Sequence, residues 1–164
     1  MIYIILGLLS ISPSHLESLR EMFWLCDNEM AKSHFYQFAR NQQSTTAESI
    51  AYEGVATAMQ ADVVGSVKDK LSYFNEGKNK IEEAIRMNPG SAEIRFLRFS
   101  VQAKIPGFLG YSGNMDEDAR IIISNLQSKN YVPSSGFWIK AKKFMLDSGE
   151  LDQELSEKLK SISI

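Results

Sequence analysis

The residues best placed to do chemistry are two arginines, Arg95 and Arg98, in a segment that is otherwise apolar. They are three residues apart, so in a helix their guanidinium groups project from one face. A guanidinium is rarely buried without a carboxylate partner, which it binds through paired hydrogen bonds. The pair therefore indicates either internal ion pairs, for example with Glu93, Asp116 or Glu117, or an accessible groove that the arginines line.

The second candidate is the connector that follows, IPGFLGYSGN, which is unusually apolar for a loop. Its glycines form neither phosphate-binding pattern, and they allow the backbone to turn sharply. We expect Phe108, Leu109 and Tyr111 to plug the gap between helical hairpins, with direct ligand recognition as the alternative. The candidate partner-binding residues are therefore Arg95, Arg98, Phe108, Leu109 and Tyr111.

The alternative, from another class of function, is a small-molecule binder or minor enzyme. Its pocket would lie near Arg98, Tyr111 and Asp116. A deep cavity with convergent polar groups would favour this hypothesis, and a shallow groove would count against it.

Catalytic and metal-binding patterns are weak. The histidines, His15 and His34, accompany no Gly-x-Ser-x-Gly elbow, because the chain has none. A calcium loop beginning at Asp116 fails, since Arg120 and Gln127 stand where oxygen ligands are needed. The acidic residues there are better explained as complements to a helix dipole. We expect no catalytic residue, no metal site and no cofactor.

Composition indicates one globular domain. Of 164 residues, 44% are hydrophobic and 23% charged, which is enough apolar material for a core. The net charge of −2 gives no attraction to phosphate backbones, so we expect no nucleic-acid partner. A single cysteine, Cys26, excludes an internal disulfide, and its helical spacing from Leu19 and Phe23 favours a buried structural thiol.

The first nine residues, MIYIILGLL, form an uncharged apolar run that is too short to span a bilayer. This run resembles the apolar part of a signal peptide, although no Lys or Arg precedes it. We expect 1–13 to be a signal peptide or an apolar N-terminal segment, and 14–164 to be a single domain. The first reading places the protein in the periplasm or cell envelope, and the second leaves it cytoplasmic. No other segment suggests a membrane span.

Helix starts are marked by capping boxes, in which a short polar side chain and a Glu three residues later satisfy each other's backbone N–H groups. Three occur: Ser14 with Glu17, Thr45 with Glu48, and Asn114 with Glu117. With apolar spacing, they predict helices at about 15–27, 29–42, 46–62, 67–87, 92–104, 115–128, 135–147 and 150–161. No convincing strand pattern occurs, so the fold class is all-α.

Three of these helices carry distinctive faces. The helix at 46–62 has a thin stripe of small residues, which lets a neighbouring helix approach closely. The helix at 92–104 is apolar nearly all round, which indicates burial on more than one side. The helix at 135–147 combines Trp138 with several lysines in a small basic amphipathic face, which indicates a solvated surface more than a membrane or nucleic-acid surface.

The segment 77–89 has a small residue, an apolar residue, an alanine and a proline at set offsets, namely Gly77, Ile81, Ala84 and Pro89. These offsets resemble the second helix of a tetratricopeptide repeat (TPR). The resemblance implies a TPR-like right-handed stack of antiparallel hairpins with about seven helices. It also implies that the small residues lie where two helices cross and that the proline closes the turn.

The segments EIRFLR at 93–98 and P-x-FLGY at 106–111, followed by acidic residues, resemble a group of small, mostly exported bacterial proteins of uncharacterised function. The resemblance implies a TPR-like fold and usually an N-terminal signal, but no activity. In TPR-like folds the first helix of each hairpin lines a concave face, where Arg95 and Arg98 would clamp a peptide carboxylate. The sequence thus favours a non-enzymatic binding or scaffold domain with a protein or peptide partner in the cell envelope.

Overall fold

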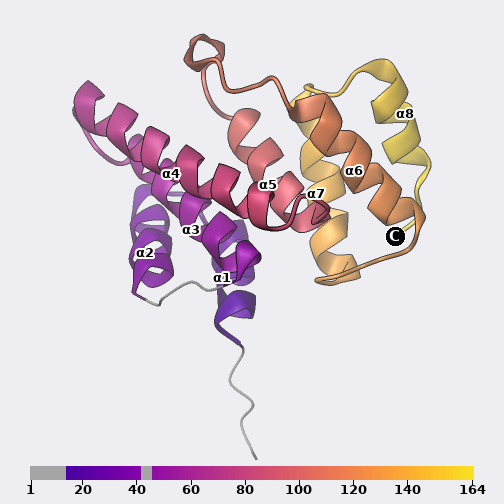
Figure 1. Ribbon diagram of the computed structural model, residues 1–164, viewed down its shortest axis with the longest axis horizontal. Helices are drawn as coiled ribbons and strands as arrows, with labels where there is room; N and C mark the ends of the chain where they lie inside the picture. Colours follow the sequence, from indigo (N-terminus) through magenta and orange to yellow (C-terminus); the bar gives the residue numbers. More distant parts are fainter. Residues whose placement is uncertain (1–13, 42–45) are drawn as a thin grey trace, which may run out of the picture.

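The computed structural model describes residues 14–41 and 46–164, and all regular secondary structure within them is helical (Figure 1). The α-helices are α1 (His15–Trp24), α2 (Glu29–Arg40), α3 (Ala47–Met59), α4 (Val67–Met87), α5 (Ala92–Gln102), α6 (Met115–Gln127), α7 (Ser135–Ser148) and α8 (Gln153–Ser161), with short 3-10 turns η1 (Gln60–Asp62) and η2 (Gly107–Leu109). The all-α expectation is confirmed. Every expected range holds a helix, and the expected count of about seven is one too low. The apolar run at 1–13 lies outside the described residues.

Side-chain caps explain most of the helix starts. Ser14 accepts a hydrogen bond from the Glu17 N–H at 3.3 Å, as expected. The cap of α3 is Thr46, which accepts from the backbone of Ser49, one residue later than the expected Thr45, itself outside the described residues. Asn114 precedes α6 but makes no side-chain cap bond, so the acidic first turn alone complements that helix end.

Helices α3 and α4 form a hairpin with a very close crossing. A Cβ atom added at Gly77 would lie 2.5 Å from the Gly54 carbonyl oxygen and 2.6 Å from the Ala58 nitrogen. The two backbones therefore touch where the small residues were expected to meet. Helix α4 then ends at Met87, immediately before the turn at 88–91.

Helix α5 lies at the centre of the molecule, between the α3–α4 hairpin and the C-terminal helices (Figure 1). Each of its residues is buried, as its apolar composition predicted. Phe96 packs edge-on against the rings of Phe23 and Phe137, and Trp24 stacks on it. This aromatic cluster joins α1, α5 and α7.

Helices α7 and α8 complete the C-terminal part. Trp138 is buried in the core and donates its indole N–H to the Val132 carbonyl, so it does not belong to the basic face predicted for α7. Lys142 instead reaches the end of α8 and donates to the carbonyls of Lys160 and Ile162. Across 14–41 and 46–164, no helix combines the length and apolarity needed to cross a membrane.

Candidate functional site

Arg98 joins three helices through buried ion pairs. Its Nε and Nη2 atoms donate to the two carboxylate oxygens of Asp118 at 2.8 and 2.7 Å, and its Nη1 donates to Glu82 at 3.0 Å. Arg98 is 3% exposed and Asp118 is fully buried. Burial lowers the pKa of Arg98, but the hydrogen bond and charge of Asp118, followed by Glu82, raise it above its usual value. The guanidinium therefore stays charged, and it binds α5 to α4 and α6.

Arg95 extends the same network. Its Nη1 donates to Glu117 and Asp118, both at 3.0 Å, and its Nε donates to the Pro89 carbonyl at 2.9 Å. Of the carboxylates proposed from the sequence, only Glu117 is a partner. Both arginines are buried, so they do not line an accessible groove, and the internal ion-pair alternative is the one found.

The carboxylate that binds both arginines belongs to Asp118, and not to Asp116, which was proposed for the pocket. Asp118 lies three residues after Met115 and four before Ile122, on the buried face of α6. Asp116 is exposed, because its position turns it away from that face. The apolar spacing of α6 was the signal that could have separated the two.

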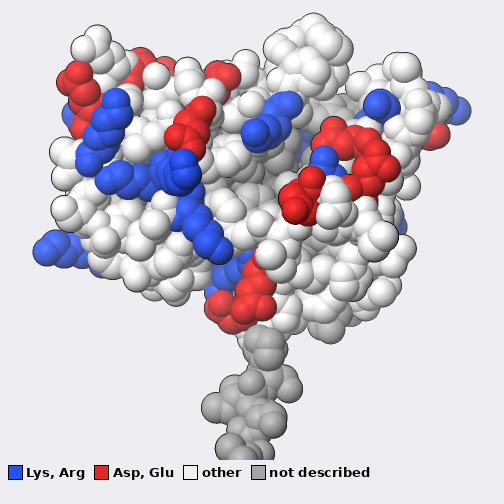
Figure 2. All heavy atoms as spheres, turned by 180° about the vertical axis from the view of Figure 1, so that it is seen from behind, with Lys and Arg blue, Asp and Glu red and all other residues white. Residues whose placement is uncertain are grey.

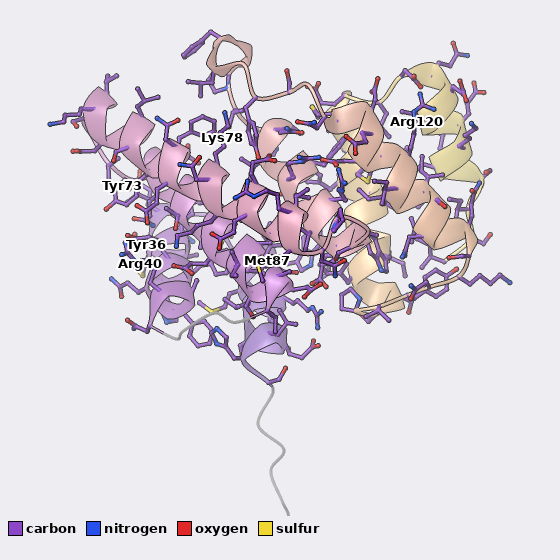
Figure 3. The ribbon with its side chains drawn as sticks, in the orientation of Figure 1. Tyr36, Arg40, Tyr73, Lys78, Met87 and Arg120 are labelled. Atoms are coloured by element: carbon purple, nitrogen blue, oxygen red, sulfur yellow. The ribbon has the colours of Figure 1, made fainter. Side chains whose placement is uncertain are left out.

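Tyr111 anchors the end of the 106–110 loop. Its hydroxyl donates to Glu82 at 2.6 Å, its ring packs on Phe74, and the ammonium of Lys78 lies 4.8 Å from the ring centre. Figure 3 labels Lys78 on α4. Burial, together with the bond to Glu82, raises the pKa of Tyr111 above its usual range. Glu82 therefore connects Tyr111 to Arg98 and to the ion pairs behind it.

Within the loop, Phe108 points away from the core and Leu109 packs against it. Phe108 is 87% exposed, whereas Leu109 is partly buried against the core. Gly110 has φ +61°, a left-handed conformation that reverses the chain immediately after η2. The expectation that all three side chains plug a gap is confirmed for Tyr111 and wrong for Phe108. Figure 1 shows the loop standing out from the helical body between α5 and α6.

A second buried network lies on the opposite side of α5, around Glu93 in its first turn. The Glu93 carboxylate accepts two hydrogen bonds from Arg20, both 2.8 Å, and one from the Tyr52 hydroxyl at 2.9 Å. Arg20 and Glu93 border a hollow of about 270 Å³, together with Asn125 and Asn130. Because its members come from α1, α3 and α5, no local sequence pattern indicated this network.

The remaining reactive side chains are separate from both networks. His15 packs against the Phe38 ring and His34 is exposed. The Cys26 thiol is partly buried rather than fully buried, and it donates to the Met22 carbonyl at 3.1 Å. Burial raises the pKa of Cys26 to about 11, and Lys32 only partly opposes this, so the thiol is protonated at neutral pH. Nowhere in the described part of the chain do three or more His, Cys, Asp or Glu side chains gather as a metal site would require.

Neither the hollow near α5 nor a second one beside α7 is lined by Arg98, Tyr111 or Asp116. Comparison with protein-family models, with curated proteins and with solved structures gives no match. The interpretation of the site therefore depends on its own geometry. That geometry is a buried, hydrogen-bonded base, built by Arg95, Arg98 and Tyr111, beneath a loop that exposes Phe108.

The buried tyrosines predict a loss of stability in alkali. Burial and a neighbouring glutamate raise the pKa of both Tyr52 and Tyr111 in the folded protein. In the unfolded chain the tyrosines lose their protons at a pH of about 10. Above this pH, proton release from the unfolded chain lowers the free energy of unfolding progressively. Stability present below that pH should therefore fall as the pH rises further.

Urea unfolding at a series of pH values above neutrality tests this expectation. Tyr52→Phe and Tyr111→Phe should each flatten the decline, because phenylalanine does not titrate. At neutral pH, Tyr111→Phe should cost only about 1 kcal/mol, the net value of one hydrogen bond. An unchanged alkaline slope in both variants would contradict the assignment.

Proposed function

We propose that this chain is a non-enzymatic, TPR-like scaffold that binds a protein or peptide partner through its 106–110 loop. The observation that carries the proposal is the contrast between the loop and its base. Phe108 is 87% exposed, yet the chain three residues later is held by Tyr111 and Glu82 at 2.6 Å. A large apolar side chain on a well-supported loop suits partner contact, because little further ordering is needed on binding.

The roles of the candidate residues differ from those expected from the sequence. Phe108 and the accessible part of Leu109 would contact the partner. Arg95, Arg98 and Tyr111 would position the loop, since each is buried and already makes hydrogen bonds within the protein. The TPR-like part of the proposal is supported by the close crossing of α3 and α4 at Gly54 and Gly77.

The small-molecule alternative has less support. Arg98 and Tyr111 both bind Glu82, but they are buried, whereas Asp116 is exposed and takes no part in their hydrogen bonds. Asp118 and Glu82 already accept four hydrogen bonds from the Arg98 guanidinium, and this side chain is 3% exposed, so a substrate carboxylate has little access to it.

Site-specific photocrosslinking tests the loop as a partner contact. A benzoylphenylalanine residue at Phe108 should give discrete adducts in native cells, because this side chain faces outward. The same residue at Met30 or Val67, which are 82% and 81% exposed, is the matched control and should give none of these adducts. Identical adduct patterns at all three positions would show that exposure alone explains the reaction.

Once a crosslinked partner is identified, Phe108→Ala should weaken its binding by at least about tenfold, as truncation of an aromatic anchor does. The melting temperature should stay unchanged, because Phe108 makes little contact with the core.

We also propose that the protein is exported to the cell envelope. The proposal depends on the apolar run at 1–13 and on the resemblance to exported proteins. Mass spectrometry of the N-terminus from native cells should find the run removed and the chain in the envelope fraction. An intact Met1 in that sample would be incompatible with a cleaved signal peptide.

A further inference from the structure

A groove lies between α7 and the segment that follows α8, with a volume of about 550 Å³. Its floor is aliphatic and consists of Ile139, Leu146, Ile162 and Ile164. Ile139 is 53% exposed, and Leu146, Ile162 and Ile164 are partly buried. The groove is therefore an apolar surface that the described chain does not cover.

The rim of this groove is basic. Lys142, Lys143 and Lys160 line it, and Asp147 is the one acidic side chain among its lining residues. The chain as a whole carries a net charge of −2, so this face has the opposite sign to the molecule. Figure 2 shows Lys and Arg side chains gathered over the α7 and α8 side of the face seen from behind.

The three lysines are not equivalent. Lys142 is fixed, since its ammonium donates to two carbonyls at the end of α8. Lys143 pairs with Asp147 at 2.6 Å, but both side chains are largely exposed, so water and salt weaken the pair. Lys143 and Lys160 can therefore turn toward an incoming anionic group without breaking a buried contact.

We propose that this groove docks an acidic amphipathic helix of a protein partner. The apolar side of such a helix would fill the aliphatic floor, and carboxylates along its flanks would meet Lys143 and Lys160. The inference rests on the proposed function, because it supplies the scaffold with a partner-binding surface, but it uses a face that the 106–110 loop does not share.

Two other occupants fit less well. A lipid bilayer presents a flat surface, whereas Ile139, Ile162 and Ile164 line a hollow between α7 and the segment after α8. Single-stranded nucleic acid needs aromatic platforms for its bases, but Phe137 and Trp138 of α7 are buried. A helix is the convex element whose size and amphipathic pattern match a lysine-rimmed apolar groove.

A selection from a random peptide library on the folded full chain tests the proposal. Enriched peptides should carry Asp or Glu together with apolar residues at helical spacing. They should bind at least tenfold more weakly to the double variant Lys143→Glu, Lys160→Glu, and more weakly at raised salt. If the charge reversal impairs folding, the double variant Lys143→Gln, Lys160→Gln replaces it, and its affinity for the peptides should fall several-fold.

The matched control is Lys68→Glu with Lys70→Glu, which reverses two exposed lysines in the first turn of α4. It should leave peptide binding unchanged. Enrichment of basic or non-amphipathic peptides, or equal losses in both charge reversals, would overturn the proposal. Lysine-dependent sedimentation with phosphatidylglycerol vesicles, without acidic peptide enrichment, would also overturn it in favour of a membrane surface. Crosslinking at Phe108 is independent of these variants, so failure of the groove and failure of the loop can be told apart.

Discussion

Replacing Asp118 with alanine is expected to destabilise the protein by about 3 kcal/mol or more, because it leaves buried arginine charges without their main partner. Asp118 is fully buried and accepts hydrogen bonds from both Arg95 and Arg98. Glu117 would still pair with Arg95, and Glu82 with Arg98. Both acids are partly exposed, however, and neither binds both arginines as Asp118 does. Urea unfolding at neutral pH measures the loss.

Asp116→Ala is the matched control, two residues earlier on the same helix. Asp116 is exposed, and none of the ion pairs includes it. Its removal should change stability by no more than about 0.5 kcal/mol, as is usual for a surface position. Equal effects of the two substitutions would show that the acidic helix start, rather than the buried ion pair, provides the stability.

A double substitution measures how much the interaction between Arg98 and Asp118 itself contributes to stability. Arg98→Met with Asp118→Leu removes one buried charge of each sign and fills the space with apolar groups. The pair should be less destabilising than the sum of the single changes, because neither single charge is left isolated. If the two effects simply add, the interaction between Arg98 and Asp118 contributes little.

Substitutions in this ion-pair network should also affect the 106–110 loop. Glu82 accepts from both Arg98 and Tyr111, so loosening the arginine also loosens the anchor of the 106–110 loop. Under the proposed function, Arg98 would therefore be a positioning residue for Phe108, 10 residues further along the chain.

Local signals in the sequence predicted the helices well. Helix α5 is apolar on all sides and is buried on all sides, and α4 ends at the turn where Pro89 cannot continue it. The small residues Gly54 and Gly77 also meet as expected, since only small side chains allow two backbones to touch. These features depend on the residue itself or on helical spacing, which the sequence displays directly.

The site was harder to predict because its partners come from distant segments. Glu82 lies 16 residues from Arg98 and 29 from Tyr111, and Tyr52 lies 41 residues from Glu93. No spacing rule connects such residues. The choice between Asp116 and Asp118 was different, since the buried stripe of α6 could have decided it.

Phe108 shows why composition alone misleads. An apolar residue beside Leu109 in a short loop favours burial, and burial was expected. The direction of the side chain depends instead on the 3-10 turn and on the left-handed backbone at Gly110, which reverses the chain. The geometry of the turn, rather than hydrophobicity, determines that Phe108 faces solvent.

Gly77→Ala is expected to have the other large effect, a loss of about 3 kcal/mol, the upper part of the range for overpacking. The new Cβ atom would lie 2.5 Å from the Gly54 oxygen and 2.6 Å from the Ala58 nitrogen. Both are backbone atoms of α3, so no side chain can rotate away and the two helices must separate. Thermal and urea unfolding measure the loss, which acts against the small gain that alanine gives in a helix.

Gly136→Ala in α7 is the matched control, because it also replaces a helical glycine but has room for the methyl group. The nearest atom to its added Cβ would be the Ser134 oxygen at 3.9 Å. Stability should stay equal or rise by up to about 1 kcal/mol, since alanine restricts the unfolded chain more than glycine does. A loss of similar size at both positions would show that helix α4 does not depend on a close crossing.

The double variant Gly54→Ala, Gly77→Ala tests the crossing itself. A Cβ atom at Gly54 would lie 2.8 Å from the Gly77 oxygen, so the two residues obstruct the same approach from opposite sides. Once the helices have moved apart for one methyl group, the second costs less, and the combined loss should be smaller than the sum. Additive losses would mean that each alanine is accommodated separately, and the hairpin would then not be held by a single point of backbone contact.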